Sequence, residues 1–505
     1  MTYPVYFSKG KRKTLQISIS WPNVVFCDLS TQTALQFMET DIVAIIGPQS
    51  SVIAHVMSLV SNELQVPLVS FAATDPTLSS LQYPFFVRTT QSDLFQMTAI
   101  AEIVDLYGWR QVIAIYIDDD YGRNGISSLG DKLAERRCQI TYKAALPPGA
   151  SRSDVSDLLI KVAMMESRVI VVHTNPYLGL TVFSVAQSLE MMGSGYVWIA
   201  TDWLASLLDS SSPLDSETMD TLQGVLALRQ HTADSQAKNA LFSRWKKLTK
   251  EADSGNFQLN AYGLYAYDTV WVIAHAMDAF LNDGGEISFS SDPRLPAAEG
   301  GNLHLDALSI FDDGRLLLHK IRNINLTGVT GPVQFDSDGY LIHPAYDIIN
   351  VIGSGMRTVG FWSNYTGLSV VTPEKLYTKP ANRSRANQQL HSVFWPAGQT
   401  TTVPRGWVFP NNGRELSIGV PNRFSYRDFV SQTPSSGTIR GFCIDVFTAA
   451  VNLLPYAVPY RFIPVGNGRE NPNYTQLVEM VASNVSMKTY STSLPFHFDL
   501  FLVNL

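Results

Sequence analysis

Short apolar runs alternate with amphipathic stretches along the first half of the chain. The clearest example joins an apolar run at residues 42–46, which ends at Gly47-Pro48, to a second run at residues 66–71. Runs of this length bounded by turn residues are typical of strands buried on both faces. The segment between them predicts a helix capped by Ser50 or Ser51. Its apolar residues recur at helical spacing and predict the buried stripe: Val52, Val56, Leu59 and Val60.

This strand–helix–strand rhythm then repeats. Further strands are predicted at residues 112–117, 168–173 and 196–200, and helices at 93–107, 125–137, 155–165 and 177–192. Strands that alternate with helices imply right-handed crossovers and a mostly parallel sheet, so the fold class is α/β. After a strand at 224–228 the pattern changes to helices at 239–250 and 259–280, followed by hairpin-like strands at 346–352 and 358–362.

Composition suggests how the chain is divided. Residues 369–410 are rich in Thr, Pro, Asn and Gln with little periodicity, which is typical of a linker. A second α/β pattern begins with a strand at 415–420, a helix from 441, a strand at 460–464 and a helix at 474–482. The pattern then stops, so we expect the second α/β domain to be incomplete.

Charge and hydropathy exclude several classes of protein. Charged residues make up 16% of the chain and the net charge is −7, which argues against a nucleic-acid partner. The N-terminus lacks the apolar core of a signal peptide, and no run reaches the roughly 18 apolar residues of a membrane helix. Five acceptor triplets for N-glycosylation favour an extracellular setting: Asn325, Asn364, Asn382, Asn473 and Asn484.

The cysteines and the known catalytic motifs narrow the choice further. Three widely spaced cysteines exclude a disulfide framework and a CxxC metal site; Cys27 and Cys138 are the candidate pair for one bridge, which only their distance in the fold decides. The chain has no GxSxG, HExxH, P-loop or GxGxxG motif. We therefore expect no enzyme activity, no cofactor and no metal, and interpret the acidic turn at 118–120 as solvated.

Polar turns stand where several predicted strands end, and they contain Ser50, Ser51, Ala73, Thr74, Tyr121, Asn175 and Asp202. Ligands of open α/β sheets bind outside the carboxyl ends of the strands, so these turns predict one binding site. The set suits a free amino acid, with hydroxyl and N–H groups on the carboxylate, Asp202 facing the ammonium and Tyr121 closing over the side chain. The alternative is that each turn is merely polar and that Ser50 or Ser51 only caps a helix.

Several motifs resemble one known family. The segments AIIGPQSS, PLVSFAATDPTLS, DDDYGRNG and TGPVQFDSDG resemble the amino-terminal domain of glutamate receptors, and GFCIDVFTAAVNLLPYAVPYRFIPVGNGRENPNY resembles the first lobe of the ligand-binding domain in plant glutamate receptor-like channels. The resemblance implies a bilobed, periplasmic-binding-protein-like (type I) domain at residues 32–368 after an atypical N-terminus at 1–31. It further implies the linker at 369–410, a partial second periplasmic-binding-like domain at 411–485 and a divergent tail at 486–505.

The resemblance also implies a function. Family members are subunits of tetrameric, amino-acid-gated, non-selective cation channels that pass calcium, with these domains on the extracellular side of the plasma membrane. Arg469 and Glu470 fall near the agonist-facing loop of the partial domain. The family's agonist-binding arginine and membrane segments are not found after Asn484, so we expect this chain to lack the pore and to reach a membrane only through such segments. The alternative is a soluble amino-acid-binding or subunit-pairing decoy.

Overall fold

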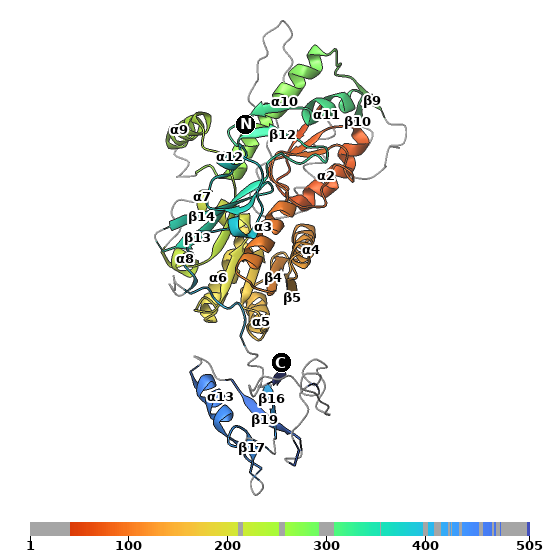
Figure 1. The fold of residues 1–505 in the computed structure, drawn as a ribbon. Coiled ribbons are helices and arrows are strands. Elements are labelled where there is room, and N and C mark those ends of the chain that lie inside the picture. The colour runs from red at the N-terminus through yellow and green to blue at the C-terminus, as the bar shows by residue number, and fades with distance from the viewer. Residues whose placement is uncertain are drawn as a thin grey trace. The chain divides into compact units, whose positions relative to one another are not determined.

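The computed structural model describes most of the chain in two compact units. The described residues are 41–210, 216–251, 258–291, 308–353, 355–396, 402–408, 416–422, 425, 427–433, 437–453, 458–466, 469–470, 475 and 502–504. The first unit comprises Met1–Ala163 with Ser167–Trp407, and the second comprises Met164–Glu166 with Val408–Leu505. Figure 1 shows the strands and helices of both units.

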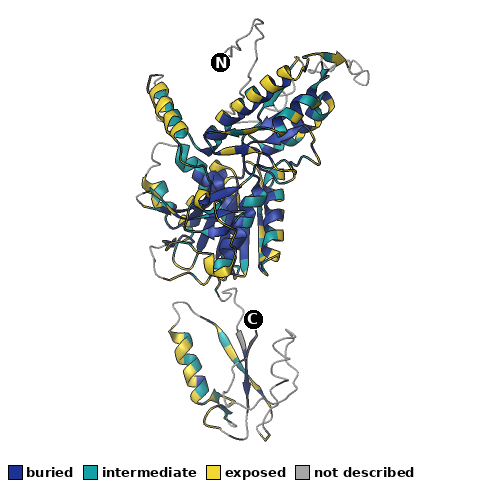
Figure 2. Ribbon diagram, turned by 45° about the horizontal axis from the view of Figure 1, so that its top comes forward, coloured by how far each residue is buried: buried dark blue, intermediate teal, exposed yellow. Residues whose placement is uncertain are grey.

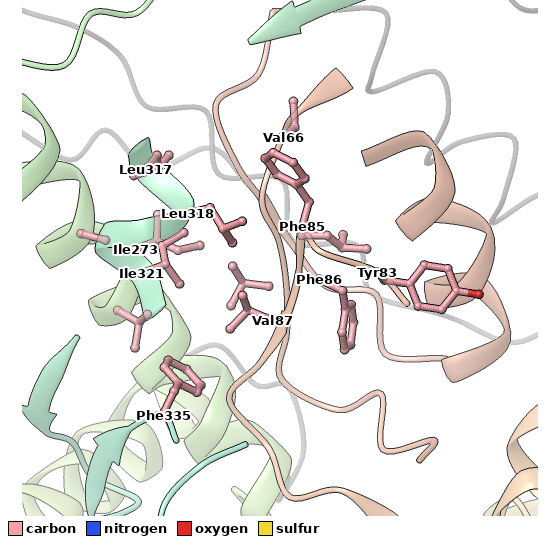
Figure 3. Packing of buried hydrophobic residues seen from close by; sticks show 14 of the residues in the cluster. Val66, Tyr83, Phe85, Phe86, Val87, Ile273, Leu317, Leu318, Ile321 and Phe335 are labelled. Carbon is pink, nitrogen blue, oxygen red and sulfur yellow. The ribbon is translucent and has the colours of Figure 1, made fainter. Parts of the chain in front are cut away.

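The first unit contains two lobes, each built on its own sheet. The sheet of the first lobe is parallel, with β1 (Ile45–Ile46), β2 (Leu68–Ser70) and β3 (Phe86–Arg88) in that order. Its helices are α2 (Ser51–Leu64), α10 (Ala261–Asn282) and α11 (Gly314–Arg322). Figure 3 shows Ile273 of α10 and Leu318 and Ile321 of α11 on the side of the sheet that Val87 faces, so the chain returns to complete this core. Two small hairpins pair β9 (Phe289–Ser291) with β10 (Ser309–Phe311) and β11 (Asn325–Thr327) with β12 (Pro332–Gln334).

The second lobe is built on an eight-stranded sheet in the order β15-β14-β13-β8-β7-β6-β4-β5. Its parallel strands are β4 (Gln111–Ile117), β5 (Gln139–Leu146), β6 (Val169–His173), β7 (Val197–Ala200) and β8 (Leu226–Gln230), and its antiparallel strands are β13 (Ala345–Ile352), β14 (Gly355–Ser363) and β15 (Gly367–Ser369). The helices are α3 (Asp93–Leu106), α4 (Asp120–Ala134), α5 (Arg152–Ala163), α6 (Pro176–Ser188), α7 (Asp202–Ser210), α8 (Ser216–Thr221), α9 (Gln236–Glu251) and α12 (Pro373–Leu376).

The burial of the parallel strands explains why their apolar runs could be recognised in the sequence. Every residue of β6 and β7 is buried, as expected for parallel strands covered on both faces. Figure 2 shows the buried residues gathered in the sheets and on the inner faces of the helices. The alternation of strands and helices is confirmed, and with it the α/β fold class.

The predicted buried stripe of α2 is correct only in part, because Val60 packs against the core of the first lobe but two of its other members do not. Val56 is 39% exposed and Leu59 is 60% exposed, whereas Ala54, Met57 and Leu64 are buried together with three serines, Ser51, Ser58 and Ser61. The helix therefore packs through its smaller residues and turns a branched apolar face outward. The hydropathy of the sequence did not mark Ser58 and Ser61 as buried, because they are polar. Small residues such as these can still face the core, since they let a helix approach its neighbours closely.

The segment predicted as a linker also differs from the expectation. Residues 369–407 belong to the first unit, where Val393 and Trp395 are buried in the core of the second lobe. The indole Nε1 of Trp109 donates to the carbonyl of Pro404 at 2.8 Å. Gly224 lies so close to the segment that a Cβ there would meet the backbone nitrogen of Pro396 at 2.3 Å. Contacts of Trp395 and Trp109 thus hold this polar segment against the second lobe, although its sequence shows no periodicity.

The second unit is small. The strand β16 (Leu416–Pro421) pairs in parallel with β19 (Tyr460–Val465) and antiparallel with β20 (Leu502–Asn504), while β17 (Ser431–Gln432) pairs with β18 (Ile439–Arg440). The helix α13 (Phe442–Asn452) contributes Ile444 to a core with Val420 and Val430. The strand β20 lies in the predicted divergent tail, which the sequence did not mark as a strand. The helix predicted at 474–482 lies almost wholly outside the described residues.

A partly buried histidine links α12 to the strands of the second lobe. His231 follows β8, and its Nδ1 lies 2.5 Å from Asp347 Oδ1 while its Nε2 lies 2.6 Å from Glu374 Oε1. Burial opposes the charged imidazolium, but the hydrogen bonds to Asp347 and Glu374 outweigh it and raise the pKa of His231 to about 9. The same contact lowers the pKa of Glu374 to about 2.

The buried face of α2 can be tested with two substitutions that lie two residues apart on the helix. Met57→Ala removes a buried side chain, and we expect it to lower the free energy of unfolding by about 2–5 kcal/mol. Leu59→Ala removes an exposed side chain and should change it by less than about 0.5 kcal/mol. Chemical denaturation measures both; the reverse order would show that the helix packs through the other face.

The imidazolium of His231 makes the stability depend on pH. Because its pKa is raised on folding, its contribution is complete below the unfolded value of about 6.5 and is lost as the pH rises through about 9. We expect this loss to be about 2 kcal/mol, which allows for screening of the half-exposed Glu374. His231→Asn should abolish the effect in denaturation curves between pH 6 and pH 10, whereas His319→Asn, at an exposed position, should retain it. An equal effect of both variants would contradict the assignment.

Candidate functional site

The predicted site residues lie where the strands of the two lobes end and the helices begin. Thr74 follows β2 of the first lobe, and Asp202 follows β7 and begins α7 of the second lobe. Both side chains are buried. They are connected by two residues that the sequence did not suggest, Asp93 and Gln96 in the first turns of α3.

The amide of Gln96 bridges the two carboxyl groups. Its Nε2 donates to Asp93 Oδ1 at 2.6 Å and lies 3.4 Å from Asp202 Oδ1, while its Oε1 accepts from the backbone N–H of Asp202 at 2.6 Å. The hydroxyl of Thr74 donates to Asp93 Oδ2 at 2.7 Å. Thr74 and Asp202 therefore belong to one hydrogen-bonded cluster that spans the two lobes.

Asp202 receives two further hydrogen bonds on its other oxygen. Tyr262 OH donates at 2.5 Å and Gln230 Nε2 at 2.9 Å. Tyr262 lies on α10 of the first lobe and Gln230 ends β8, so neither is near Asp202 in the sequence. Burial raises the pKa of Asp202, and burial together with the neighbouring Asp202 charge raises the pKa of Asp93 to about 8. Burial and the proximity of the two groups therefore disfavour the state in which both carboxyl groups are ionised.

Tyr121 packs on a neutral histidine. Its ring centroid lies 4.1 Å from that of His173, whose Nδ1 is 3.0 Å from the hydroxyl of Thr201. Burial lowers the pKa of His173 to about 4, so the imidazole is neutral at physiological pH. Tyr121 therefore lies close to Thr201, the residue that precedes Asp202.

A second polar cluster joins the lobes beside the first. Asp75 Oδ2 lies 2.9 Å from His55 Nε2 of α2 and accepts from Asn124 Nδ2 of α4 at 2.9 Å. The hydroxyl of Ser51 accepts from the N–H of Asp75 at 3.3 Å. Burial opposes the ionised Asp75, but the hydrogen bonds from His55 and Asn124 outweigh it and lower its pKa. Asn124 is thus a direct link between α4 of the second lobe and the turn after β2.

Three predicted residues stand apart from these clusters. Ser50 precedes α2 and makes no capping hydrogen bond with its side chain. The N–H of Ala73 donates to Ser70 Oγ at 2.9 Å, so it is already engaged. Asn175 is exposed and caps α6 by accepting from the N–H of Leu178 at 2.9 Å.

The sequence analysis did not name several residues of the two polar clusters. Some of them could have been recognised from their position in the sequence, and others could not. Asp75 adjoins the predicted Thr74, and Asp93 stands at a recognisable helix start, so both could have been included from their position. Gln96, His173, Gln230 and Tyr262 gave no such signal, because they lie within or beyond regular elements and meet the site only in the folded chain.

The remaining sequence predictions are only partly described. Asn325, Asn364 and Asn382 are exposed, and Asn473 and Asn484 lie outside the described residues. Arg469 and Glu470 are exposed residues of the second unit after β19. Cys138 is buried with a free thiol that donates to the carbonyl of Trp109 at 3.3 Å, and Cys27 lies outside the described residues.

The described part of the chain contains neither a metal-binding cluster nor a helix that could span a membrane. No group of three or more His, Cys, Asp or Glu side chains there could hold a metal ion. No helix among the same residues is long and apolar enough to cross a membrane.

Comparison with known proteins identifies the family. Residues 25–354 match the family model described as the receptor family ligand binding region. The chain belongs to this receptor family. The match covers all the residues of the two polar clusters, so the site described above lies within the ligand-binding region.

Several proteins similar to this chain are plant glutamate receptors. The chain is 62% identical to glutamate receptor 3.1 of Oryza sativa subsp. japonica over 89% of its own length and 48% of the relative. It is 55% identical to glutamate receptor 3.4 of Arabidopsis thaliana over 92% of its length and 48% of the relative. Glutamate receptor 3.2 of the same plant is 54% identical over 90% of the chain and 50% of the relative. The chain thus spans about half the length of these relatives and is a glutamate receptor-like ligand-sensing portion.

The link through Asn124 gives a prediction about the contact between the lobes. Asn124→Ala removes the hydrogen bond to Asp75, and we expect a loss of about 1 kcal/mol in stability and faster hydrogen exchange at the amide of Thr77, which is bound to the same carboxylate. Asn239→Ala, at an exposed position on α9, is the matched control and should change neither. Unchanged exchange at Thr77 in Asn124→Ala would show that the link does not hold the turn.

Proposed function

We propose that the chain is the extracellular ligand-sensing portion of a channel subunit that amino acids gate and that passes cations, including calcium, without strong selectivity. The relatives' names, glutamate receptors, support an amino acid as the ligand. The channel, its gating and its ion selectivity are carried over from the resemblance of the sequence to plant glutamate receptor-like channels. The receptor names also favour a binding protein over an enzyme. In this proposal the ligand-sensing units lie outside the plasma membrane and assemble with other receptor subunits into a tetramer.

One observation supports an amino acid ligand most directly. Thr74 of the first lobe and Asp202 of the second lobe are joined through Asp93 and Gln96 at the carboxyl ends of their sheets. Ligands of open α/β sheets bind at this position, so a molecule there would touch both lobes. In the proposal Asp202 faces the ammonium group, Ser50 and Ser51 at the start of α2 face the carboxylate, and Tyr121 borders the side chain.

The outer face of α2 supports a second candidate function. Val56 and Leu59 expose an apolar surface on this helix, and exposed apolar surface is a common feature of protein interfaces. A module that pairs with intact subunits would use such a surface without any need for a ligand. The two candidates differ in whether the cluster between the lobes binds a small molecule.

Ligand binding can be tested by thermal unfolding of the full chain with each of the twenty standard amino acids at 10 mM. A ligand at a hundred times its dissociation constant stabilises the folded state by about 2.7 kcal/mol, and we expect a rise of a few degrees in the unfolding temperature with at least one amino acid. Asp202→Asn should abolish the rise, and Asp157→Asn, at an exposed position on α5, should retain it. No rise with any amino acid would leave the pairing module as the better proposal.

A further inference from the structure

The outer face of α10 carries a row of exposed aromatic side chains. Tyr267 is 40% exposed, Trp271 is 47% exposed, and His275 is exposed one turn further along the helix. The ring centroids of Tyr267 and Trp271 lie 6.4 Å apart, and those of Trp271 and His275 lie 5.8 Å apart. The opposite face of α10 packs into the core of the first lobe, so these rings take no part in that core. Tyrosine and tryptophan are enriched in protein interfaces, and the row is therefore typical of a docking surface.

An acidic group extends this row. Asp278 is exposed, and it lies on the same face because it follows Trp271 by seven residues. It accepts a hydrogen bond from Asn282 Nδ2 at 3.4 Å and forms no ion pair with the described residues. Aromatic rings and carboxylates both attract cations, as the chain shows elsewhere, where Arg168 Cζ lies 5.0 Å from the ring centroid of Tyr196. The aromatic face of α10, which comprises Tyr267, Trp271, His275 and Asp278, therefore favours a positively charged partner.

The helix α9, which Figure 1 labels, offers the complementary charge. None of its residues 236–249 is buried, and basic residues recur along it although the whole chain has a net charge of −7. Its basic face comprises four exposed residues spaced by three or four positions: Ala240, Ser243, Arg244 and Lys247. Arg244 forms no ion pair with the described residues.

The two faces are complementary in shape as well as in charge. Ala240 and Ser243 are small, so they leave room for a bulky ring such as that of Trp271. Arg244 lies beside them and is long enough to stack on a ring while its guanidinium reaches Asp278. Within one chain the two faces do not cover each other, because the residues of both are exposed. A second copy of the chain supplies the missing face without any further protein.

We propose that the basic face of α9 in one copy of the chain packs on the aromatic face of α10 in a second copy. Every copy carries both faces, so the contact can form twice about a two-fold axis and give a closed dimer. The inference rests on the part of the proposed function in which subunits assemble, and it adds the faces through which two copies meet. These faces are distinct from the exposed apolar surface of α2.

Sedimentation equilibrium of the full chain tests the proposal. We expect a dimer whose dissociation constant rises with added salt, because salt screens the attraction between exposed charges. Trp271→Ala and Arg244→Glu should each raise the dissociation constant by about tenfold or more. Lys161→Glu, which reverses an exposed charge on α5, is the matched control and should leave it unchanged. All three positions are outside the core, so thermal unfolding should confirm that the variants fold.

An exchange of charges tests which helices meet. Asp278→Arg should weaken the dimer by itself, because it places a positive charge opposite Arg244 of the second copy. The double variant Asp278→Arg with Arg244→Glu restores opposite charges across the contact. We expect its dissociation constant to return to within about threefold of the unaltered value. Two losses that add in the double variant would contradict the pairing of α9 with α10.

The outcomes separate this inference from the proposed function. A monomer at every concentration, or a dimer that Trp271→Ala and Arg244→Glu leave intact, would overturn the inference. If Leu59→Glu on α2 abolishes the dimer instead, copies assemble through α2 and the proposed function stands without the inference. The rise in unfolding temperature with an amino acid does not depend on α9 or α10, so ligand sensing can succeed or fail independently of this contact.

Discussion

The bridge that Gln96 makes between two buried carboxyl groups is the contact on which the rest of the site depends. One amide reaches both Asp93 and Asp202, and Thr74 and Tyr262 bring the first lobe onto the same pair. Carboxyl groups placed this close in the interior cannot both be charged at low cost. The protein holds them in place with neutral donors, the amides of Gln96 and Gln230 and the hydroxyls of Thr74 and Tyr262.

The contacts between the lobes share this polar character. Asn124 reaches Asp75 from the second lobe, and Tyr262 reaches Asp202 from the first. Each lobe has its own apolar core, built around separate sheets. Apolar packing therefore stabilises the lobes individually, whereas hydrogen bonds among a few buried side chains set how the lobes meet. Such contacts can be exchanged for contacts to a ligand at little cost, which suits a binding protein.

Aromatic anchors rather than regular elements hold the segment that ends the first unit. Trp395 packs in the core of the second lobe, and Trp109 binds the carbonyl of Pro404. The segment thus belongs to the second lobe up to the boundary of the unit at Trp407.

The sequence by itself determined the α/β class, most of the alternation of strands and helices in the first unit, and the ends of β2 and β7 that carry Thr74 and Asp202. These follow from local patterns, because a strand buried on both faces must be apolar and must end in a polar turn. Only the tertiary structure decided which face of α2 is buried, that the segment with Trp395 is packed, and that Gln96, Gln230 and Tyr262 meet Asp202. Those outcomes depend on the distance between residues remote in the chain and on the fit of small side chains against neighbours, and no local pattern encodes either.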